Sequence, residues 1–257
     1  MSKVFDAYAA YYDLLYRHKD YAGEAAYVDR IIQRHHPGAR RMLELGCGTG
    51  GHALHMSERG YEVTGTDISE QMVEIADKSS AHQMQAGQQP RFLVGDMRTL
   101  RLDASFDVVT SLFHVMSYQT TNSDLLAAMT TAAAHLTSGG LFVFDAWHGP
   151  GVLAEGPTTR VRRIEGDGFT VTRIAEPVHH HLLNRVDVHY EVMLERNGAI
   201  ERLRECHRMR YLFVPEVELL LSLAGLQLCA TYGWLTETPP EPRSWYACFV
   251  AMKMGDH

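Results

Sequence analysis

Runs of strand-forming residues alternate with segments of helical periodicity between residues 41 and 145, and this alternation limits the fold more than any other feature of the chain. The expected strands are residues 41–45, 61–67, 91–94, 106–111 and 140–145. The expected helices cover residues 51–59, 69–76 and 125–136. Strand–helix–strand units at this spacing give parallel strand pairs with right-handed crossovers. The alternation therefore predicts an α/β fold with a mostly parallel sheet.

The segments on either side of this region follow other patterns. Residues 5–36 have the aromatic and apolar spacing of two helices, which Pro37 and Gly38 end. After residue 150 come four β-rich stretches without helices between them, at 161–164, 169–175, 185–194 and 200–213. Asn197 and Gly198, between the last two stretches, are typical of a hairpin turn. A helix at 216–224, a strand from residue 226 and a strand at 245–252 are expected to close the chain.

Together these patterns predict a single domain of 257 residues. Its parts are an N-terminal helical segment at 1–40, a core at 41–150, an antiparallel β insertion at 155–213, and a C-terminal helix with closing strands at 214–257. The expected core is a doubly wound, Rossmann-like, mostly parallel sheet of seven strands.

Charge and composition exclude several classes of protein. The formal net charge of -7 argues against long-range attraction to nucleic-acid phosphates, so we expect no nucleic-acid partner. No run of 18 apolar residues occurs, so we expect no membrane span, and the acidic, aromatic first residues are unlike a secretory signal. The four cysteines lie far apart without a CxxC pair, which indicates neither a disulfide framework nor a zinc site. A cytoplasmic protein fits these features best.

A glycine-rich loop, Leu-Glu-Leu-Gly-Cys-Gly-Thr-Gly at residues 43–50, joins the first strand to a helix. Such a loop needs glycine where φ is positive or where a ligand presses on the backbone. It also directs backbone N–H groups from a helix start toward an anionic or polar ligand. Asp67 ends the second strand about 20 residues later, where a carboxylate suits two vicinal ribose hydroxyls. The loop and Asp67 therefore predict a ligand that contains a nucleoside.

The surrounding sequence narrows the choice of ligand. The glycines alone also satisfy the dinucleotide pattern GxGxxG, so by themselves they leave a nicotinamide cofactor open. However, the loop reads E-x-G-x-G-x-G and begins after some 40 residues of helix. Gly95-Asp96-Met97 follows the third strand, where Asp96 can accept from an adenine amino group. With the closing helix, strand, Pro-rich loop and strand, this arrangement resembles the class I S-adenosylmethionine-dependent methyltransferases over nearly the whole chain.

This resemblance implies S-adenosyl-L-methionine as the cofactor. It assigns the methionine part of the cofactor to Gly46, Cys47 and Gly48, and the ribose to Asp67. It places Ile68 and Met72 on either side of the adenine, and Asp96 and the Met97 N–H at the adenine edge. Leu112 would contact the cofactor through its backbone, and Tyr12 would belong to an N-terminal helical lid over residues 1–40. For Tyr12, the alternative is an aromatic helix face packed in the core.

Acceptor residues are expected beyond the carboxyl ends of the fourth and fifth strands, where doubly wound sheets bind ligands. Methyl transfer from a sulfonium is an in-line displacement, so these residues must hold the nucleophile on the methyl–sulfur axis. The candidates are Tyr118, His114 and His148 as catalytic groups, with Phe113 and Trp147 in the acceptor pocket. The alternative for each histidine is a hydrogen bond to a loop backbone, and for Tyr118 it is packing at a helix start. A hydroxyl acceptor usually needs a base, whereas an amine need only arrive neutral, so both acceptors stay open.

No metal is expected. His179, His180 and His181 are consecutive residues of a predicted strand, so their side chains alternate between faces and cannot all point at one ion. The paired Asp and Asn of metal-dependent catechol-type methyltransferases are not evident. The Asn-Pro-Pro-Tyr motif of many nucleic-acid and glutamine amino methyltransferases is also missing after the fourth strand.

The insertion carries a second resemblance. Its placement, with the Tyr-Tyr-Asp start and the Arg-Tyr-Leu-Phe run at 210–213, looks like the N-methyltransferases of nucleotide-linked deoxyamino sugars, and also like relatives of glycine N-methyltransferase. That resemblance implies an insertion that walls the acceptor site, and it leaves a homodimer open. Tyr118 departs from it, because some members have histidine at the matching position. Four insertion arginines could meet a phosphate of the acceptor, with solvated surface as the alternative: Arg160, Arg162, Arg163 and Arg173.

The sequence therefore predicts an S-adenosylmethionine-dependent methyltransferase acting on nitrogen or oxygen of a small polar metabolite. A sugar or nucleotide-linked amino sugar is favoured over other phosphorylated or amine metabolites. Two rival interpretations from other classes remain, a nicotinamide-dependent oxidoreductase and a non-catalytic cofactor-binding partner.

Overall fold

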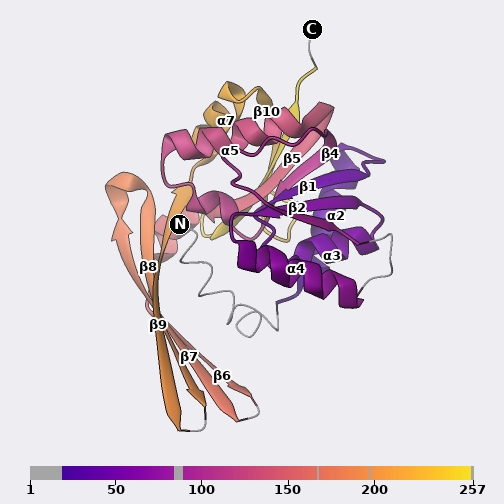
Figure 1. Cartoon of the computed structure of the whole chain (residues 1–257). Coiled ribbons are helices and arrows are strands. Elements are labelled where there is room, and N and C mark those ends of the chain that lie inside the picture. The colour runs from indigo at the N-terminus through magenta and orange to yellow at the C-terminus, as the bar shows by residue number, and fades with distance from the viewer. Residues whose placement is uncertain (1–18, 84–88, 167, 197, 256–257) are drawn as a thin grey trace.

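The core of the molecule is a twisted sheet with helices on both faces (Figure 1). The computed structural model describes residues 19–83, 89–166, 168–196 and 198–255. Within these residues the core sheet has seven strands in the order β3-β2-β1-β4-β5-β11-β10. Their bounds are β1 Arg41–Leu45, β2 Glu62–Asp67, β3 Arg91–Val94, β4 Phe106–Ser111, β5 Leu136–His148, β10 Leu226–Gly233 and β11 Tyr246–Lys253. Strands β1 to β5 pair in parallel and β11 is antiparallel to both neighbours, which confirms the predicted fold.

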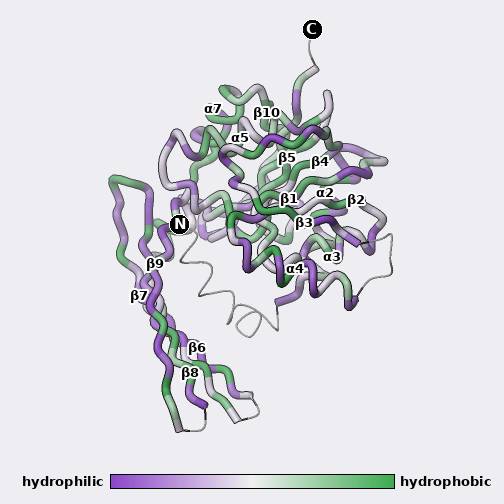
Figure 2. The backbone as a smooth tube through the Cα atoms, viewed as in Figure 1, coloured by the Kyte–Doolittle hydropathy of each residue, from purple (hydrophilic) through white to green (hydrophobic). Residues whose placement is uncertain are grey.

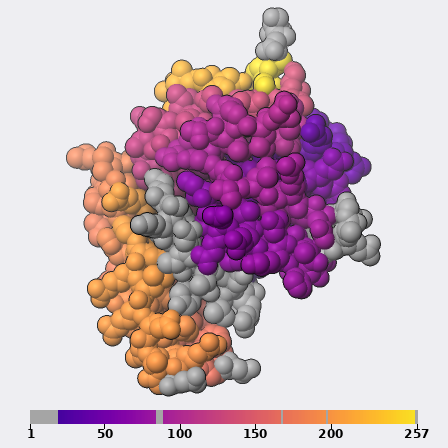
Figure 3. Space-filling view, in the orientation of Figure 1, coloured from indigo at the N-terminus to yellow at the C-terminus, as the bar shows by residue number. Residues whose placement is uncertain are grey.

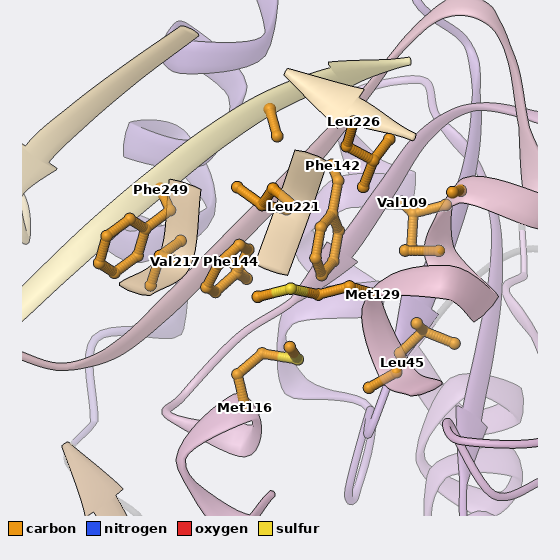
Figure 4. Close-up of a cluster of buried hydrophobic side chains, with 14 of the residues drawn as sticks. Leu45, Val109, Met116, Met129, Phe142, Phe144, Val217, Leu221, Leu226 and Phe249 are labelled. Carbon is orange, nitrogen blue, oxygen red and sulfur yellow. The ribbon is translucent and has the colours of Figure 1, made fainter. Parts of the chain in front are cut away.

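Two groups of helices cover the sheet because both of its faces are apolar. On one side pack α2 (Tyr21–His35), α3 (Gly51–Glu58) and α4 (Glu70–Gln83), and on the other α5 (Asn122–His135) and α7 (Val214–Leu223). Successive strand residues point to opposite faces. In β5, Val143 therefore joins the α2 side, whereas Phe142 and Phe144 join the α5 and α7 side, where Phe144 also stacks on Phe249 (Figure 4).

The insertion is an antiparallel sheet in the order β6-β7-β8-β9, as predicted. Its strands are β6 Arg160–Gly166, β7 Phe169–His180, β8 Arg185–Arg196 and β9 Ala199–Leu212, and η2 His181–Leu183 lies between β7 and β8. Pairing of β8 with β9 reaches Arg196 and Ala199, where the hairpin was predicted. The hydrophobic residues concentrate in the core strands, whereas the insertion strands mix polar and apolar residues along their length (Figure 2).

The insertion continues the core sheet. Pairing of β4 with β5 ends at Ser111 and Phe144, and beyond that point β9 takes the same place beside β5, pairing in parallel at Trp147 with Tyr211. The part of the insertion that lies away from β5 also contacts the core, because Val171 of β7 and Val192 of β8 pack on Met72 of α4. The insertion thus forms a lobe beside the core (Figure 3).

Three elements differ from the prediction. Strand β5 begins at Leu136, four residues before the predicted start at Gly140. A 3₁₀ turn η1 (Val115–Tyr118) follows β4, and a short helix α6 (Gly149–Glu155) follows β5. The Gly-Pro-Gly start of α6 is typical of a turn, but glycine is needed at Gly151 because a Cβ there would lie 2.0 Å from the Ser244 carbonyl oxygen.

In the part of the chain that the structure describes, no helix is both long enough and apolar enough to cross a bilayer.

Candidate active site

One large cavity of about 410 Å³ lies where the core sheet meets the insertion. Its core side is formed by the loops that follow β1, β2, β3 and β4, and its other side by residues of β6, β7, β8 and β9. Loops at the carboxyl ends of parallel strands are where doubly wound sheets bind ligands. Most of the residues proposed from the sequence line this one cavity.

The glycine loop presents bare backbone to the cavity. Gly46 and Gly48 both have positive φ, of 79° and 54°. A Cβ on Gly46 would lie 2.4 Å from Val115, whereas a Cβ on Gly48 would meet nothing within 4 Å. The backbone at Gly48 therefore borders open space, as expected for a loop that a ligand approaches closely.

Asp67 is anchored by that loop at the end of β2. Its Oδ2 accepts from the Gly48 N–H at 2.9 Å and its Oδ1 from the Ser69 N–H at 2.9 Å. Burial raises the pKa of Asp67, and the backbone N–H groups of Ser69, Gly48 and Ile68 oppose that rise. A carboxylate has about four acceptor positions, so this one can accept further hydrogen bonds from a ligand in the cavity.

Asp96 also lines the cavity, but its carboxylate has a partner that the sequence did not suggest. Arg98 donates to both oxygens, with Nε at 3.0 and 3.1 Å and Nη2 at 2.6 Å, and its Nη1 also reaches Asp124 at 3.1 Å. The hydrogen bonds from Arg98 lower the pKa of Asp96. Asp96 is therefore a fixed, ionised acceptor. The remaining predicted cofactor residues that line the cavity are Cys47, Ile68, Met72, Met97 and Leu112.

Phe113 and His114 lie on a strained turn after β4. Both have left-handed backbone angles, with φ of 66° and 63°, which cost a residue other than glycine roughly 1–2 kcal/mol. The His114 N–H donates to Asp145 at 3.1 and 3.2 Å, its ring also contacts that carboxylate, and it stacks on Tyr246 at 4.2 Å between centroids. The turn brings Phe113 and His114 to the cavity wall.

Tyr118 lies on η1 and points toward the insertion. Its hydroxyl is 2.7 Å from Nδ1 of His207, and Nε2 of His207 is 3.0 Å from Oε2 of Glu205. His207 and Glu205 are buried, and His207 lines the cavity with Tyr118. Neither residue could be predicted from the sequence, because only the packing of β9 against η1 brings them near Tyr118.

His148 differs from the other candidates because it does not line the cavity. Its Nδ1 lies 3.0 Å from the Ser244 carbonyl oxygen, and burial lowers its pKa. The hydrogen bond to a loop backbone, considered as the alternative, is therefore the one present. Trp147 does line the cavity. Its backbone N–H donates to the Ser117 hydroxyl at 3.0 Å, and its ring is edge-on to Trp245.

Arginines of the insertion form the far wall. Arg160, Arg162 and Arg173 line the cavity, and the guanidinium of Arg173 lies 5.1 Å from the centre of the Tyr190 ring. Arg162 and Arg173 are directly opposite each other in the β6–β7 pair. Arg163 points to the other face of the sheet, so it does not join this group.

Two further predictions concern residues elsewhere. Tyr12 lies outside the described residues, as do all positions before residue 19. His179 contacts Tyr211 and His180 contacts Asp187 instead, as expected for neighbouring strand residues. His181 lies in η2 rather than in a strand, and its ring is 3.7 Å from that of His179 between centroids. Among the described residues, no group of three or more His, Cys, Asp or Glu could hold a metal ion.

Known proteins are similar to this chain in sequence. The methyltransferase domain family matches residues 42–140. The dTDP-3-amino-3,4,6-trideoxy-alpha-D-glucopyranose N,N-dimethyltransferase of Streptomyces venezuelae is 32% identical over an alignment of 229 residues that covers 86% of this chain and 90% of that protein.

Two solved structures are similar over 95% of this chain. A sugar N-methyltransferase from Streptoalloteichus is 26% identical with a TM-score of 0.81 over 93% of its own length. An amino pentose methyltransferase from Micromonospora, solved with S-adenosylmethionine bound, is 25% identical with a TM-score of 0.75 over 96% of its length.

Proposed function

The chain belongs to the S-adenosylmethionine-dependent methyltransferases, and we propose that its acceptor is the amino group of a nucleotide-linked amino sugar. When bound, S-adenosylmethionine supplies a methyl group made electrophilic by a positively charged sulfur. Family membership decides against the nicotinamide-dependent oxidoreductase that the glycine pattern left open. The acceptor class is supported by the relative from Streptomyces venezuelae, whose name specifies a dTDP-linked amino sugar.

The core side of the cavity would hold the cofactor. The backbone of Gly46, Cys47 and Gly48 would contact its methionine part, and Asp67 would accept from the ribose hydroxyls. The open space above Gly48 and the remaining acceptor positions of Asp67 support this assignment.

The adenine would lie between apolar side chains at one end of the cavity. Ile68 and Met72 would flank its ring, with Leu112 contacting the cofactor through its backbone. Asp96 would accept from the adenine amino group with an oxygen that Arg98 also holds, and the Met97 N–H would meet the ring edge. Arg98 would then act by fixing the direction of the Asp96 carboxylate.

The arginines on the far wall are the observation that carries the acceptor proposal. Arg162 and Arg173 face each other across two strands, an arrangement that like charges make unfavourable. A diphosphate between them would turn this repulsion into charge-assisted hydrogen bonds. Arg160 lies two residues before Arg162 and lines the same wall, so three guanidinium groups would surround the phosphates.

The sugar would then lie between the phosphates and the cofactor. Phe113 and Trp147 would form apolar contacts with its ring, and Tyr118 and His114 are polar side chains that line the same cavity. In this arrangement, Tyr118 would contact the reacting amine.

Binding of dTDP to protein saturated with S-adenosylhomocysteine tests the acceptor proposal. We expect dTDP to bind more tightly than thymidine, and Arg162→Gln to weaken dTDP binding about 10-fold or more, the effect of losing a charge-assisted hydrogen bond. Arg163→Gln, on the opposite face, is the matched control and should leave dTDP binding unchanged. Equal affinity for dTDP and thymidine would refute the phosphate role.

A further inference from the structure

Tyr118, His207 and Glu205 form a hydrogen-bonded chain that leads from the cavity into the insertion. The Tyr118 hydroxyl lies 2.7 Å from His207 Nδ1, and His207 Nε2 lies 3.0 Å from Glu205 Oε2. Glu205 and His207 are two residues apart on β9, so both side chains point to the same face of the insertion. Side chains of His207 and Glu205 are only 3% and 2% exposed.

The order of donors along this chain follows from its buried end. An ionised carboxylate only accepts hydrogen bonds, so Glu205 requires the proton of the imidazole on Nε2. Nδ1 of a neutral His207 is then an acceptor, and Tyr118 donates its O–H to it. A phenol oxygen can accept as well as donate, so Tyr118 can take a proton from a group in the cavity.

The carboxylate of Glu205 is costly where it lies. Its Oε1 is buried and has no hydrogen-bond partner among the described residues. A buried polar atom without a partner destabilises the folded protein, because it has lost its hydrogen bonds to water. Such a cost is offset if a positive charge forms beside it, and an imidazolium at His207 would be that charge.

We propose that Tyr118, His207 and Glu205 form a proton relay that removes a proton from the acceptor's ammonium group before methyl transfer. The proposal rests on the amine acceptor proposed above. In the relay, the ammonium N–H proton moves to the Tyr118 oxygen while the Tyr118 proton moves to His207 Nδ1. This leaves a neutral amine and an imidazolium paired with Glu205. The amine nitrogen then bonds to the methyl carbon as the carbon–sulfur bond breaks, with its electron pair remaining on sulfur.

The chemistry requires such a step. An ammonium has no lone pair, so only the neutral amine can attack the methyl group. A general base that removes the proton typically contributes 10²- to 10⁴-fold to rate. Tyr118 would be catalytic because it contacts the acceptor, whereas His207 and Glu205 would act through Tyr118 as positioning residues.

Other titratable groups face the relay from the neighbouring strands. Tyr190 of β8 is edge-on to His207, with ring centroids 4.9 Å apart at 87°. The guanidinium of Arg173, on β7, lies over that Tyr190 ring. Tyr118 of η1 and Glu205 of β9 also contact His207. Of these four groups only Glu205 is acidic, so it is the one that would balance an imidazolium.

Rates measured against pH test the relay. The acceptor is dTDP-3-amino-3,4,6-trideoxy-alpha-D-glucopyranose, and the variants are Tyr118→Phe, His207→Gln and both together. At pH 7 we expect each to lower kcat/KM roughly 100-fold. The loss should shrink as the pH rises, because free amine then forms without a base. The double variant should be no slower than Tyr118→Phe, since residues that act as one unit are not additive. His179→Gln, a histidine on the same sheet outside the cavity, is the control.

The tautomer of His207 is a second test that needs no acceptor. In ¹⁵N NMR spectra of wild-type protein saturated with S-adenosylhomocysteine, neutral His207 should carry its proton on Nε2. The signals that are lost in the His207→Gln spectrum are those of His207. A neutral His207 protonated on Nδ1 would overturn the relay.

The two proposals fail separately. No methyl transfer to the dTDP-linked amine by the wild-type protein would overturn the proposed function. Transfer with equal fold losses at every pH, or with fully additive effects of Tyr118→Phe and His207→Gln, would instead overturn the relay.

Discussion

At the scale of single residues, the proposed cofactor site depends most on Asp67. Its carboxylate is held by backbone N–H groups from the glycine loop and from the residue that precedes α4, so its orientation is set before any ligand arrives. A rigid acceptor loses little entropy on binding. Asp67 therefore links the geometry of β1 and β2 to recognition of the ribose.

We predict that Asp67→Ala weakens binding of S-adenosylhomocysteine by about 1–3 kcal/mol, the range for losing hydrogen bonds to a charged group. Isothermal titration calorimetry measures this loss directly. Asp103→Ala, at an exposed position beyond the opposite end of the sheet, is the control and should bind as the wild type does. Unchanged affinity in Asp67→Ala would remove Asp67 from the site.

Glu44 gives a prediction about pH. Burial, together with repulsion from Asp67, raises its pKa from 4.5 to about 8 in the folded protein. Between these two values the folded protein holds a proton that the unfolded chain has lost, so the free energy of unfolding falls as the pH rises. Glu44→Gln is neutral at every pH, and we expect its Tm to exceed that of the wild type by a few degrees at pH 8 and by less at pH 5.

Calorimetric scans of the ligand-free proteins at the two pH values make this comparison. Glu62→Gln, an exposed change on β2, is the control. A difference in Tm that is the same at pH 5 and pH 8 would show that Glu44 does not titrate in this interval.

Residues next to a strand end could be predicted from the sequence, whereas residues brought in by strand pairing could not. Three residues that line the cavity lie at the end of a strand or within three positions after it: Gly48, Asp67 and His114. His207 and Glu205 lie inside a long strand whose apolar and polar residues alternate without a local signal. The pairing of β9 with β8 and its contact with η1 are what bring His207 and Glu205 to Tyr118.

At the scale of elements, the insertion closes the cavity through a small apolar contact. Val171 and Val192 pack on Met72 of α4, far along the chain from the junction of β9 with β5. The predicted residue ranges for β1, β3 and β4 coincide with the observed strands, because each is a short apolar run bounded by polar or turn residues. Strands β6, β7 and β8 extend beyond their predicted ends, since long antiparallel pairing tolerates charged residues on one face.

We predict that Val171→Ala costs about 1–3 kcal/mol locally, from lost burial and the space left between the insertion and α4. Hydrogen exchange should become faster in β6 and β7 and stay unchanged in β1 and β4, because local opening follows local contacts. Val178→Ala, on the exposed outer face of the same strand, is the matched control. Equal protection of β7 in Val171→Ala and wild type would mean that this contact does not hold the insertion.

At the scale of the whole molecule, one sheet holds both halves of the site. The core strands carry the glycine loop and Asp67, and β9 extends the same sheet into the wall that carries His207 and the neighbouring arginines. Ligands in the two parts of the cavity would contact both halves, as the proposed transfer of a methyl group from a nucleoside-containing cofactor to a nucleotide-linked acceptor requires. A homodimer, which the sequence analysis left open, stays untested.

The most direct measurement is methyl transfer itself, followed by mass spectrometry. The protein is incubated with S-adenosylmethionine and either dTDP-3-amino-3,4,6-trideoxy-alpha-D-glucopyranose or dTDP-glucose, which has hydroxyls but no amine. We predict that one or more methyl groups are added to the amino sugar nucleotide and none to dTDP-glucose. Methylation of dTDP-glucose, or none of the amino sugar nucleotide by protein that binds S-adenosylhomocysteine, would contradict the proposed acceptor.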